Sequence, residues 1–359
     1  MKRAIIVAGV VFLSAGIVQA GTRADLSGDA VVDFATTMDM PFMTVGNPGN
    51  AADMRYDPFS PNGFGRVDYV YRIGKFEVTA GQYCEFLNAI ATTDTYGLYN
   101  TNMWSDSYGC KIQRSGSSGG YSYSVAADWA DRPVNYVSWG DAARFANWLT
   151  NGMPTGDQDL TRTEDGSYFL NGATSDATLQ TVTRKAEARW AITTEDEWHK
   201  AAYYDSSKAG GAGYWDYPTG CDTVPSNVVT DPDGGNNANY YDYYGIGNGT
   251  WSIGSPYYQT EVGQFETSET QYGTFDQGGN VWEWIEGNAY GTTRELRGGS
   301  FYTDGIYGHY DTMHASHRNG VHPAFEGPHI GFRVAEVPEP ATLGLLAVGG
   351  LAVLRRRPA

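Results

Sequence analysis

The stretch Phe275–Ile285, which reads F-D-Q-G-G-N-V-W-E-W-I, decides the fold. Its second half alternates in character, and alternate residues of an extended chain face opposite sides. Trp282 and Trp284 would therefore share one face, which is large enough to anchor a core. Val281 and Glu283 would share the other face. We expect this segment to form an aromatic core strand.

The same stretch offers a set of oxygen ligands. Carbonyls two residues apart along a strand point the same way, so Gly279 and Val281 can present oxygens side by side. Asp276 and Glu283 can add carboxylates at the two ends of the set. Calcium takes about six to eight oxygen ligands of this mixed kind. The spacing alone is more typical of an aromatic core strand that carries one solvated glutamate.

Two more segments follow the hexapeptide G-N-V-W-E-W in order. Arg297–Phe301 reads R-G-G-S-F, and Ile330–Val334 reads I-G-F-R-V. The ordered set resembles the formylglycine-generating enzyme family, also called the sulfatase-modifying factor domain, and its matching segments run from about Arg72 to Val334. The resemblance implies an α+β fold that is C-type-lectin-like and has little regular secondary structure.

The resemblance also implies calcium at two places. The first set joins two carboxylates to two carbonyls: Asp276, Glu283, and the carbonyl oxygens of Gly279 and Val281. The second set would use Asn239, the Tyr240 carbonyl and an acidic residue shortly before Val262. This chain has Gly254, Ser255 and Pro256 at that point, so the acidic ligand of the second set is missing.

The resemblance also implies copper chemistry. The copper-dependent enzymes of the family oxidise a substrate cysteine to formylglycine, and they use two cysteines shortly after the R-G-G-S motif. Copper(I) needs soft thiolate ligands. In this chain Thr303 and Gly308 stand about where those thiols would be, and no cysteine occurs after Cys221. We therefore expect no copper and assign no catalytic residue.

A lectin-like scaffold without the oxidase thiols still offers an aromatic and polar cleft. We place this cleft around Trp282, Arg297 and Tyr302, where a peptide or a glycan at the cell surface would bind. The main reading is a surface binding module. The alternative is an enzyme of the same family with a different chemistry in the same cleft.

Composition narrows the class of protein further. The 359 residues are ample for a core, and 46 glycines with 14% aromatic residues favour tight turns around large side chains. The formal net charge of −17 repels the phosphate backbones of nucleic acids, so we expect no nucleic-acid partner. The three cysteines, Cys84, Cys110 and Cys221, allow one disulfide and one free thiol, and their pairing is open.

Both ends of the chain carry targeting signals. Residues 1–20 combine Lys2 and Arg3 with an apolar run and a small-residue end, which predicts a signal peptide and export. Residues 337–359 hold P-E-P, an apolar run and three arginines, and they resemble the PEP-CTERM sorting tail. This resemblance implies an exosortase-type sorting machinery as partner. It also implies a membrane anchor at the C terminus before processing, with the protein in the cell envelope or outside the cell.

Between these ends we expect a lead-in segment at 21–65 and the sulfatase-modifying-factor-type domain at 66–336. Capping boxes predict three helix starts, at Thr79–Gln82, Ser138–Asp141 and Thr194–Glu197. The alternation in Val67–Ile73 predicts a strand. An Asp-Gly turn within 163–168 predicts a surface hairpin.

Overall fold

The computed structural model describes residues 23–24, 30–31, 38–55, 62–288, 291–302 and 310–338. The predicted signal peptide, the sorting tail beyond Pro338, and Thr303 and Gly308 lie outside these residues. Within them, no helix is both long enough and apolar enough to cross a membrane. The chain divides into two units, 1–39 and 40–359. In the first unit, β1 (Arg23–Ala24) pairs antiparallel with β2 (Ala30–Val31).

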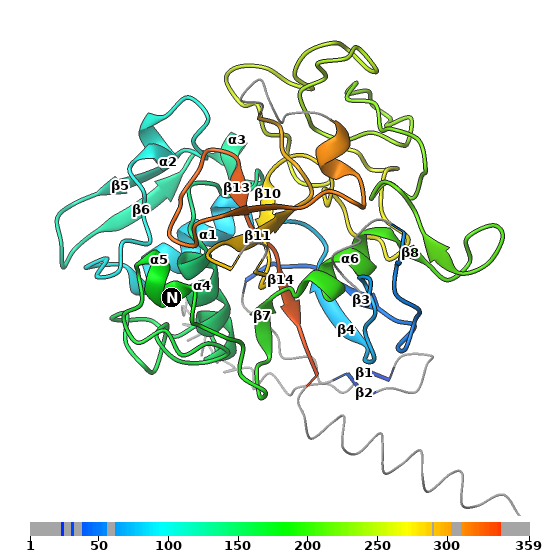
Figure 1. Cartoon of the computed structure of the whole chain (residues 1–359). Coiled ribbons are helices and arrows are strands. Elements are labelled where there is room, and N and C mark those ends of the chain that lie inside the picture. Colours follow the sequence, from blue (N-terminus) through cyan, green and yellow to red (C-terminus); the bar gives the residue numbers. More distant parts are fainter. Residues whose placement is uncertain are drawn as a thin grey trace, which may run out of the picture. The chain divides into compact units, whose positions relative to one another are not determined.

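The first four-stranded sheet of the second unit is antiparallel throughout and joins distant parts of the chain (Figure 1). Its order is β3 (Phe42–Val45), β4 (Tyr71–Gly74), β14 (Val334–Glu336) and β7 (Trp190–Ile192). All four residues of β3 pair with β4, so β3 belongs to the domain. The sequence analysis places these residues in the lead-in segment, because the long connection between the two strands hides their pairing from the sequence.

The second four-stranded sheet contains the motif strand. Its order is β12 (Asn319–Val321), β11 (Arg294–Arg297), β10 (Trp282–Trp284) and β13 (Ile330–Gly331). Strand β10 runs antiparallel to β11 and parallel to β13. Because β10 is a central strand, the aromatic core strand predicted from the sequence has a hydrogen-bonded neighbour on each side.

All three helices predicted from capping boxes are present: α1 (Ala80–Ile90), α4 (Trp139–Thr150) and α6 (Glu195–Tyr203). In each, the side chain of the N-cap residue accepts a hydrogen bond from the backbone three residues on, and the reciprocal bond is also made. Short helical turns add α2 (Asn102–Ser105), α3 (Ala127–Ala130), α5 (Asp176–Leu179) and the 3₁₀ turn η1 (Tyr310–Met313).

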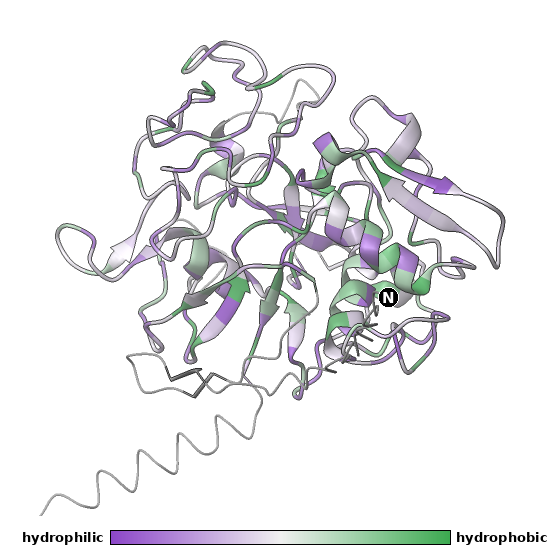
Figure 2. Cartoon of the chain, turned by 180° about the vertical axis from the view of Figure 1, so that it is seen from behind, coloured by the Kyte–Doolittle hydropathy of each residue, from purple (hydrophilic) through white to green (hydrophobic). Residues whose placement is uncertain are grey.

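Two hairpins complete the regular structure: β5 (Ile112–Ser115) with β6 (Ser122–Val125), and β8 (Tyr204–Asp205) with β9 (Gly213–Tyr214). Long irregular segments make up much of the rest. Figure 2 shows hydrophobic and hydrophilic stretches alternating along helices, strands and connecting segments alike. The fold is α+β with little regular secondary structure, as predicted.

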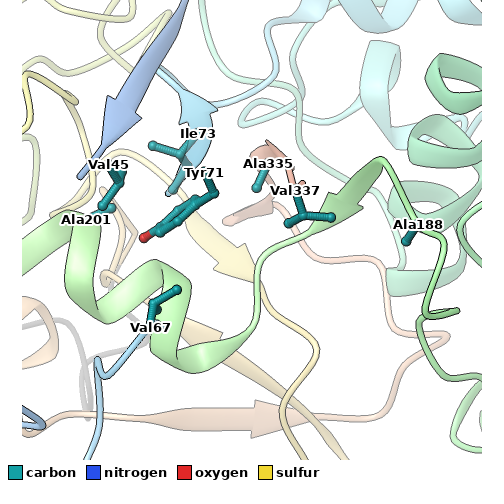
Figure 3. Packing of buried hydrophobic residues seen from close by; sticks show 8 residues of the cluster. All are labelled: Val45, Val67, Tyr71, Ile73, Ala188, Ala201, Ala335 and Val337. Carbon is teal, nitrogen blue, oxygen red and sulfur yellow. The ribbon is translucent and has the colours of Figure 1, made fainter. Parts of the chain in front are cut away.

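A hydrophobic cluster holds helix α6 against the first sheet (Figure 3). Ala201 of α6 packs with Val45, Tyr71, Ile73 and Ala335, all at most 2% exposed. Full burial of a side chain of valine or isoleucine size stabilises the fold by about 1.5–3 kcal/mol. The cluster therefore fixes the position of β14. It also fixes Arg333, the residue directly before that strand.

Two local predictions are wrong. The strand predicted at 67–73 begins only at Tyr71, where pairing with Val45 starts. The hairpin predicted at 163–168 does not form, since the segment has no strand pairing beyond an isolated bridge from Tyr168. Instead the buried Glu164 carboxylate binds the Arg144 guanidinium at 2.7 and 3.0 Å, and this ion pair holds the segment as a packed loop.

Candidate functional site

The motif strand β10 is buried on both faces. Trp284 is fully buried and its indole N–H donates to the Val137 carbonyl at 2.9 Å. Trp282, which is 6% exposed, packs its ring against His317. Glu283 on the opposite face is 0% exposed. A solvated glutamate, the alternative that the spacing allowed, is therefore excluded.

The Glu283 carboxylate is held by two internal donors. The Arg333 guanidinium donates to both of its oxygens, from Nε and Nη2, at 2.6 Å each. The Trp198 indole N–H donates to Oε2 at 2.7 Å. Arg333 is itself fully buried. Desolvation lowers the pKa of its guanidinium, but the negative charge and the hydrogen bonds of Glu283 outweigh this effect and raise the pKa above the ordinary value. This is a forked, charge-assisted pair of the strong kind.

The loop before β10 is shaped by positive φ angles. Asp276 has φ +58° and Gly279 has φ +84°, and the backbone of Asn280 donates to the Asn239 carbonyl at 2.8 Å. The Asp276 carboxylate accepts the Gly263 N–H at 2.6 Å. Burial raises the pKa of Asp276 to about 6, although Gly263 and Arg333 both act to lower it. The loop thus holds a half-buried carboxylate within the electrostatic reach of Arg333.

Glu77 is a member of this site that the sequence analysis missed. It lies two residues before Thr79, the N-cap of α1, and its neighbour Val78 donates to the Phe332 carbonyl at 2.9 Å. Glu77 is 1% exposed and neither carboxylate oxygen has a hydrogen-bond partner. Burial, and then the negative charge of Asp276, raise the pKa of Glu77 well above its usual range. The only signal in the sequence is a charged residue between apolar Phe76 and Val78.

A small pocket lies beside this carboxylate cluster. Its lining combines the polar side chains of Thr219, Asn237, Ser268 and Asp276 with Pro218, Phe265, Phe275 and Gly278. In the described part of the chain, no three His, Cys, Asp or Glu side chains are arranged to hold a metal by themselves. A cation here would therefore need backbone carbonyls or water besides the carboxylates, which is the donor mixture that calcium accepts.

The second predicted calcium set has different surroundings. The Tyr240 carbonyl accepts hydrogen bonds from Nδ2 of Asn227 at 3.1 Å and from Oγ of Ser252 at 3.3 Å. The Asn239 amide donates to the Tyr258 carbonyl at 3.0 Å, while its own Oδ1 is buried without a partner. Amide and hydroxyl donors thus occupy the carbonyl that would face an ion. This second set, Asn239 with Tyr240, remains a prediction from the resemblance.

The three residues predicted to line a cleft differ in exposure. Trp282 and Arg297 are buried, and both contact His317, whose ring packs on Trp282 and whose carbonyl accepts from Arg297 at 2.6 Å. Arg297 also forms an ion pair with Glu195. These two side chains therefore lie in the interior of the domain. Tyr302 alone is half-buried.

Around Tyr302 lies a group of half-buried rings, which we call the aromatic surface: Tyr108, Tyr258, Tyr302 and His329. Tyr302 stacks on His329 with ring centroids 5.3 Å apart and planes 7° apart. Tyr108 meets Tyr302 edge-on at 5.2 Å and lies 4.7 Å from Tyr258. The sequence gives no sign of this grouping, because Tyr108 comes from a loop far from the others along the chain.

Comparison with known proteins places these features in a family. The chain matches the model of the sulfatase-modifying factor enzyme 1-like domain over residues 33–337. Residues 336–357 match the PEP-CTERM protein-sorting motif. No curated protein matches the chain significantly.

Solved structures show similarity over most of the chain. Treponema denticola variable protein 1 is 20% identical, with a TM-score of 0.48, over 83% of this chain and 95% of that chain. CarF is 18% identical, with a TM-score of 0.45, over 84% of this chain and 99% of that chain. PvdO from Pseudomonas aeruginosa is 16% identical, with a TM-score of 0.43, over 83% and 92% of the two chains.

Proposed function

The chain belongs to the sulfatase-modifying factor enzyme 1-like domain family, and from this premise we propose that it is a calcium-stabilised binding module without oxidase activity. The PEP-CTERM motif marks it for export and sorting to the envelope by an exosortase-type machinery. The apolar run of the tail would anchor it in the membrane before processing. Its ligand would be a peptide or a glycan at the cell surface.

The observation that carries the proposal is the lack of suitable thiols. No cysteine follows the R-G-G-S motif, and the three cysteines of the chain lie elsewhere as free thiols. Burial raises the pKa of Cys84 and of Cys110 to about 11, so both are protonated near neutral pH. Copper(I) binds thiolates. The residues present therefore do not fit a copper site of the family type.

The aromatic surface supports ligand binding. Half-buried aromatic rings offer large, rigid contact area at a low cost in conformational entropy, and ring faces suit both sugar rings and peptide side chains. The contacts among Tyr108, Tyr258, Tyr302 and His329 hold the rings in place before a ligand arrives. Such preorganisation favours affinity because little order has to be created on binding.

Calcium would bind beside β10. The residues that would hold it are Asp276 and Glu283 with the carbonyls of Gly279 and Val281. Bound calcium would supply positive charge between the half-buried Asp276 carboxylate and the buried Glu283 carboxylate. In that role it stabilises the native state by mass action, because the unfolded chain has no preformed site.

We expect no conversion of a sulfatase-type Cys-x-Pro-x-Arg peptide to its formylglycine form. The reason is the missing thiol pair, since Thr303 and Gly308 stand at those positions. Purified protein, peptide, copper and reductant are incubated, and the peptide mass is followed. Copper(I) binding is measured in parallel and should not be stoichiometric. Turnover by the wild-type protein would show that it is an oxidase and would contradict the proposal.

Replacing Tyr302 with alanine should weaken ligand binding about three- to tenfold, because one aromatic contact contributes about 0.5–1.5 kcal/mol beyond its buried area. The measurement uses the exported protein against an immobilised panel of glycans and unstructured peptides. Tyr243→Ala, at a ring that is 63% exposed and outside the aromatic surface, is the matched control. Equal binding by both variants would remove the aromatic surface from the proposal.

A further inference from the structure

The aromatic surface continues into two further rings. Trp251 meets Tyr258 edge-on, with ring centroids 5.4 Å apart, and Tyr241 meets Trp251 edge-on at 4.8 Å. Both added rings are half-buried, like the four rings of the aromatic surface. Consecutive centroids lie 4.7–5.4 Å apart along the whole set. We call this set the aromatic run, in the order of its contacts: Tyr241, Trp251, Tyr258, Tyr108, Tyr302 and His329.

The segment that carries the two added rings is fixed by backbone contacts. Tyr241 and Trp251 form an isolated antiparallel bridge, and the Asp242 N–H donates to the Thr250 carbonyl at 2.8 Å. The Asp242 carboxylate is 1% exposed and accepts three backbone N–H groups of residues 246–249 at 2.7–3.0 Å. These bonds hold the two rings in place before a ligand arrives, which reduces the entropy lost on binding.

Tyr258 joins the two halves of the run, because its ring contacts both Trp251 and Tyr108. Its φ of +59° is uncommon for a bulky residue. The Asn239 amide donates to the Tyr258 carbonyl at 3.0 Å, and the Tyr258 N–H donates to the Gly254 carbonyl at 3.2 Å. Strained residues of this kind persist only where their surroundings hold them, and they are concentrated at ligand sites.

Tyrosine supplies four of the six rings, and their hydroxyls determine the chemistry of the run. In the part of the chain that the structure describes, the hydroxyls of Tyr108, Tyr241, Tyr258 and Tyr302 have no hydrogen-bond partner within the protein. Each of these side chains thus combines an apolar ring with a hydroxyl that can donate and accept. A sugar has the complementary pattern, with C–H groups on the face of its ring and hydroxyls at the rim.

Two other ligand classes fit the run less well. The backbone N–H groups of Tyr108 and Tyr302 donate to the Asp106 carboxylate at 2.8 Å and the Ser300 hydroxyl at 3.3 Å. Peptides that bind in an extended form draw much of their affinity from such main-chain groups, which are already used here. The formal net charge of −17 opposes a polyanionic ligand. A neutral glycan meets neither obstacle.

We propose that the aromatic run binds a neutral glycan chain several sugar residues long, through its ring faces and its tyrosine hydroxyls. This inference rests on the proposed function. It selects the glycan from the two ligand classes named there, and it extends the site beyond the aromatic surface to Trp251 and Tyr241. A single sugar can cover only part of the run. Each further ring contact should strengthen binding about two- to tenfold.

The ligand class is tested by titrating the exported protein with neutral oligosaccharides of glucose, mannose and N-acetylglucosamine, followed by calorimetry. The hexasaccharide of at least one series should bind at least about tenfold more tightly than its disaccharide, because it reaches more rings. A galacturonate hexamer and an unstructured peptide of similar length should bind more weakly. If the peptide binds more tightly than every neutral glycan, the glycan assignment is wrong while the binding module stands. If no probe binds, the proposed function is wrong as well.

The extent of the site is tested with Trp251→Ala, which should weaken binding of the hexasaccharide about three- to tenfold. Melting temperatures without ligand show whether this and the other variants are folded. A folded Trp251→Ala protein that binds the hexasaccharide as the wild type does would contradict the extension of the site beyond the aromatic surface.

The role of the hydroxyls is tested with the double variant Tyr108→Phe, Tyr302→Phe, which keeps both rings. It should bind the hexasaccharide about three- to tenfold more weakly, with an unchanged melting temperature, because neither hydroxyl has a partner within the described protein. Tyr96→Phe is the matched control, since Tyr96 is also half-buried and its ring lies outside the run, 4.6 Å from the Arg144 guanidinium. Equal binding by the double variant and the control would contradict hydrogen bonding of the glycan by the run.

Discussion

Replacing Arg333 with methionine should lower the free energy of unfolding by about 3–5 kcal/mol, the usual cost of removing one partner of a buried ion pair. Arg333 is fully buried and donates to both oxygens of Glu283. It also donates to the Gly74 carbonyl at 3.0 Å and the Phe275 carbonyl at 2.9 Å. Its loss leaves the carboxylate cluster with no guanidinium, in a domain whose whole stability is of the order of 5–15 kcal/mol.

The measurement is urea unfolding at fixed calcium concentration. Arg189→Met is the control, because Arg189 is 21% exposed on its side chain and pairs with Glu336, and such partly solvated pairs are worth about 0–1 kcal/mol. A double variant, Glu283→Leu with Arg333→Met, should recover part of the loss, since apolar residues often replace a buried ion pair without cost. If Arg333→Met and Arg189→Met unfold at the same urea concentration, the buried pair does not hold the site together.

The features that could be predicted from the sequence are local ones. A capping box is a pair of hydrogen bonds between residues three apart, so Thr79 with Gln82 and Thr194 with Glu197 identify α1 and α6 directly. The motif strand follows from alternation, which is also local. The sequence predicts the start of β4 four residues too early, at Val67. The strand begins at Tyr71 because its start depends on pairing with Val45, which is far away in sequence.

The candidate site depends on long-range contacts and was therefore only partly predictable. Asp276 and Glu283 belong to one motif, but the partner of Glu283 is 50 positions further along the chain. Glu77 reaches the same region from just before α1, more than 200 residues before β10, and nothing near it in sequence suggests a charged cluster. The sequence analysis places Arg297 in a cleft together with Trp282 and Tyr302. The fold instead buries it with Glu195.

Gly279→Ala should destabilise the domain by about 3 kcal/mol or more, because two costs add at this position. Gly279 has φ +84°, which costs an L-residue roughly 1–2 kcal/mol. A Cβ there would also lie 2.2 Å from the carbonyl oxygen of Asn239, and that oxygen is backbone and cannot turn away. Thermal and urea unfolding measure the loss.

Gly97→Ala separates the two costs. Gly97 has a similar φ of +71°, but its added Cβ would meet nothing within 4 Å, so only the conformational cost applies. The Gly279 substitution should therefore cost clearly more than the Gly97 substitution. It should also weaken calcium binding, because the Asn239 backbone that must move is hydrogen-bonded to Asn280, between the two carbonyls of the proposed site. Equal losses at the two glycines would mean that the loop can shift freely away from Asn239. A loop that yields so easily could not position carbonyl ligands for an ion, and the calcium site would then rest on carboxylates alone.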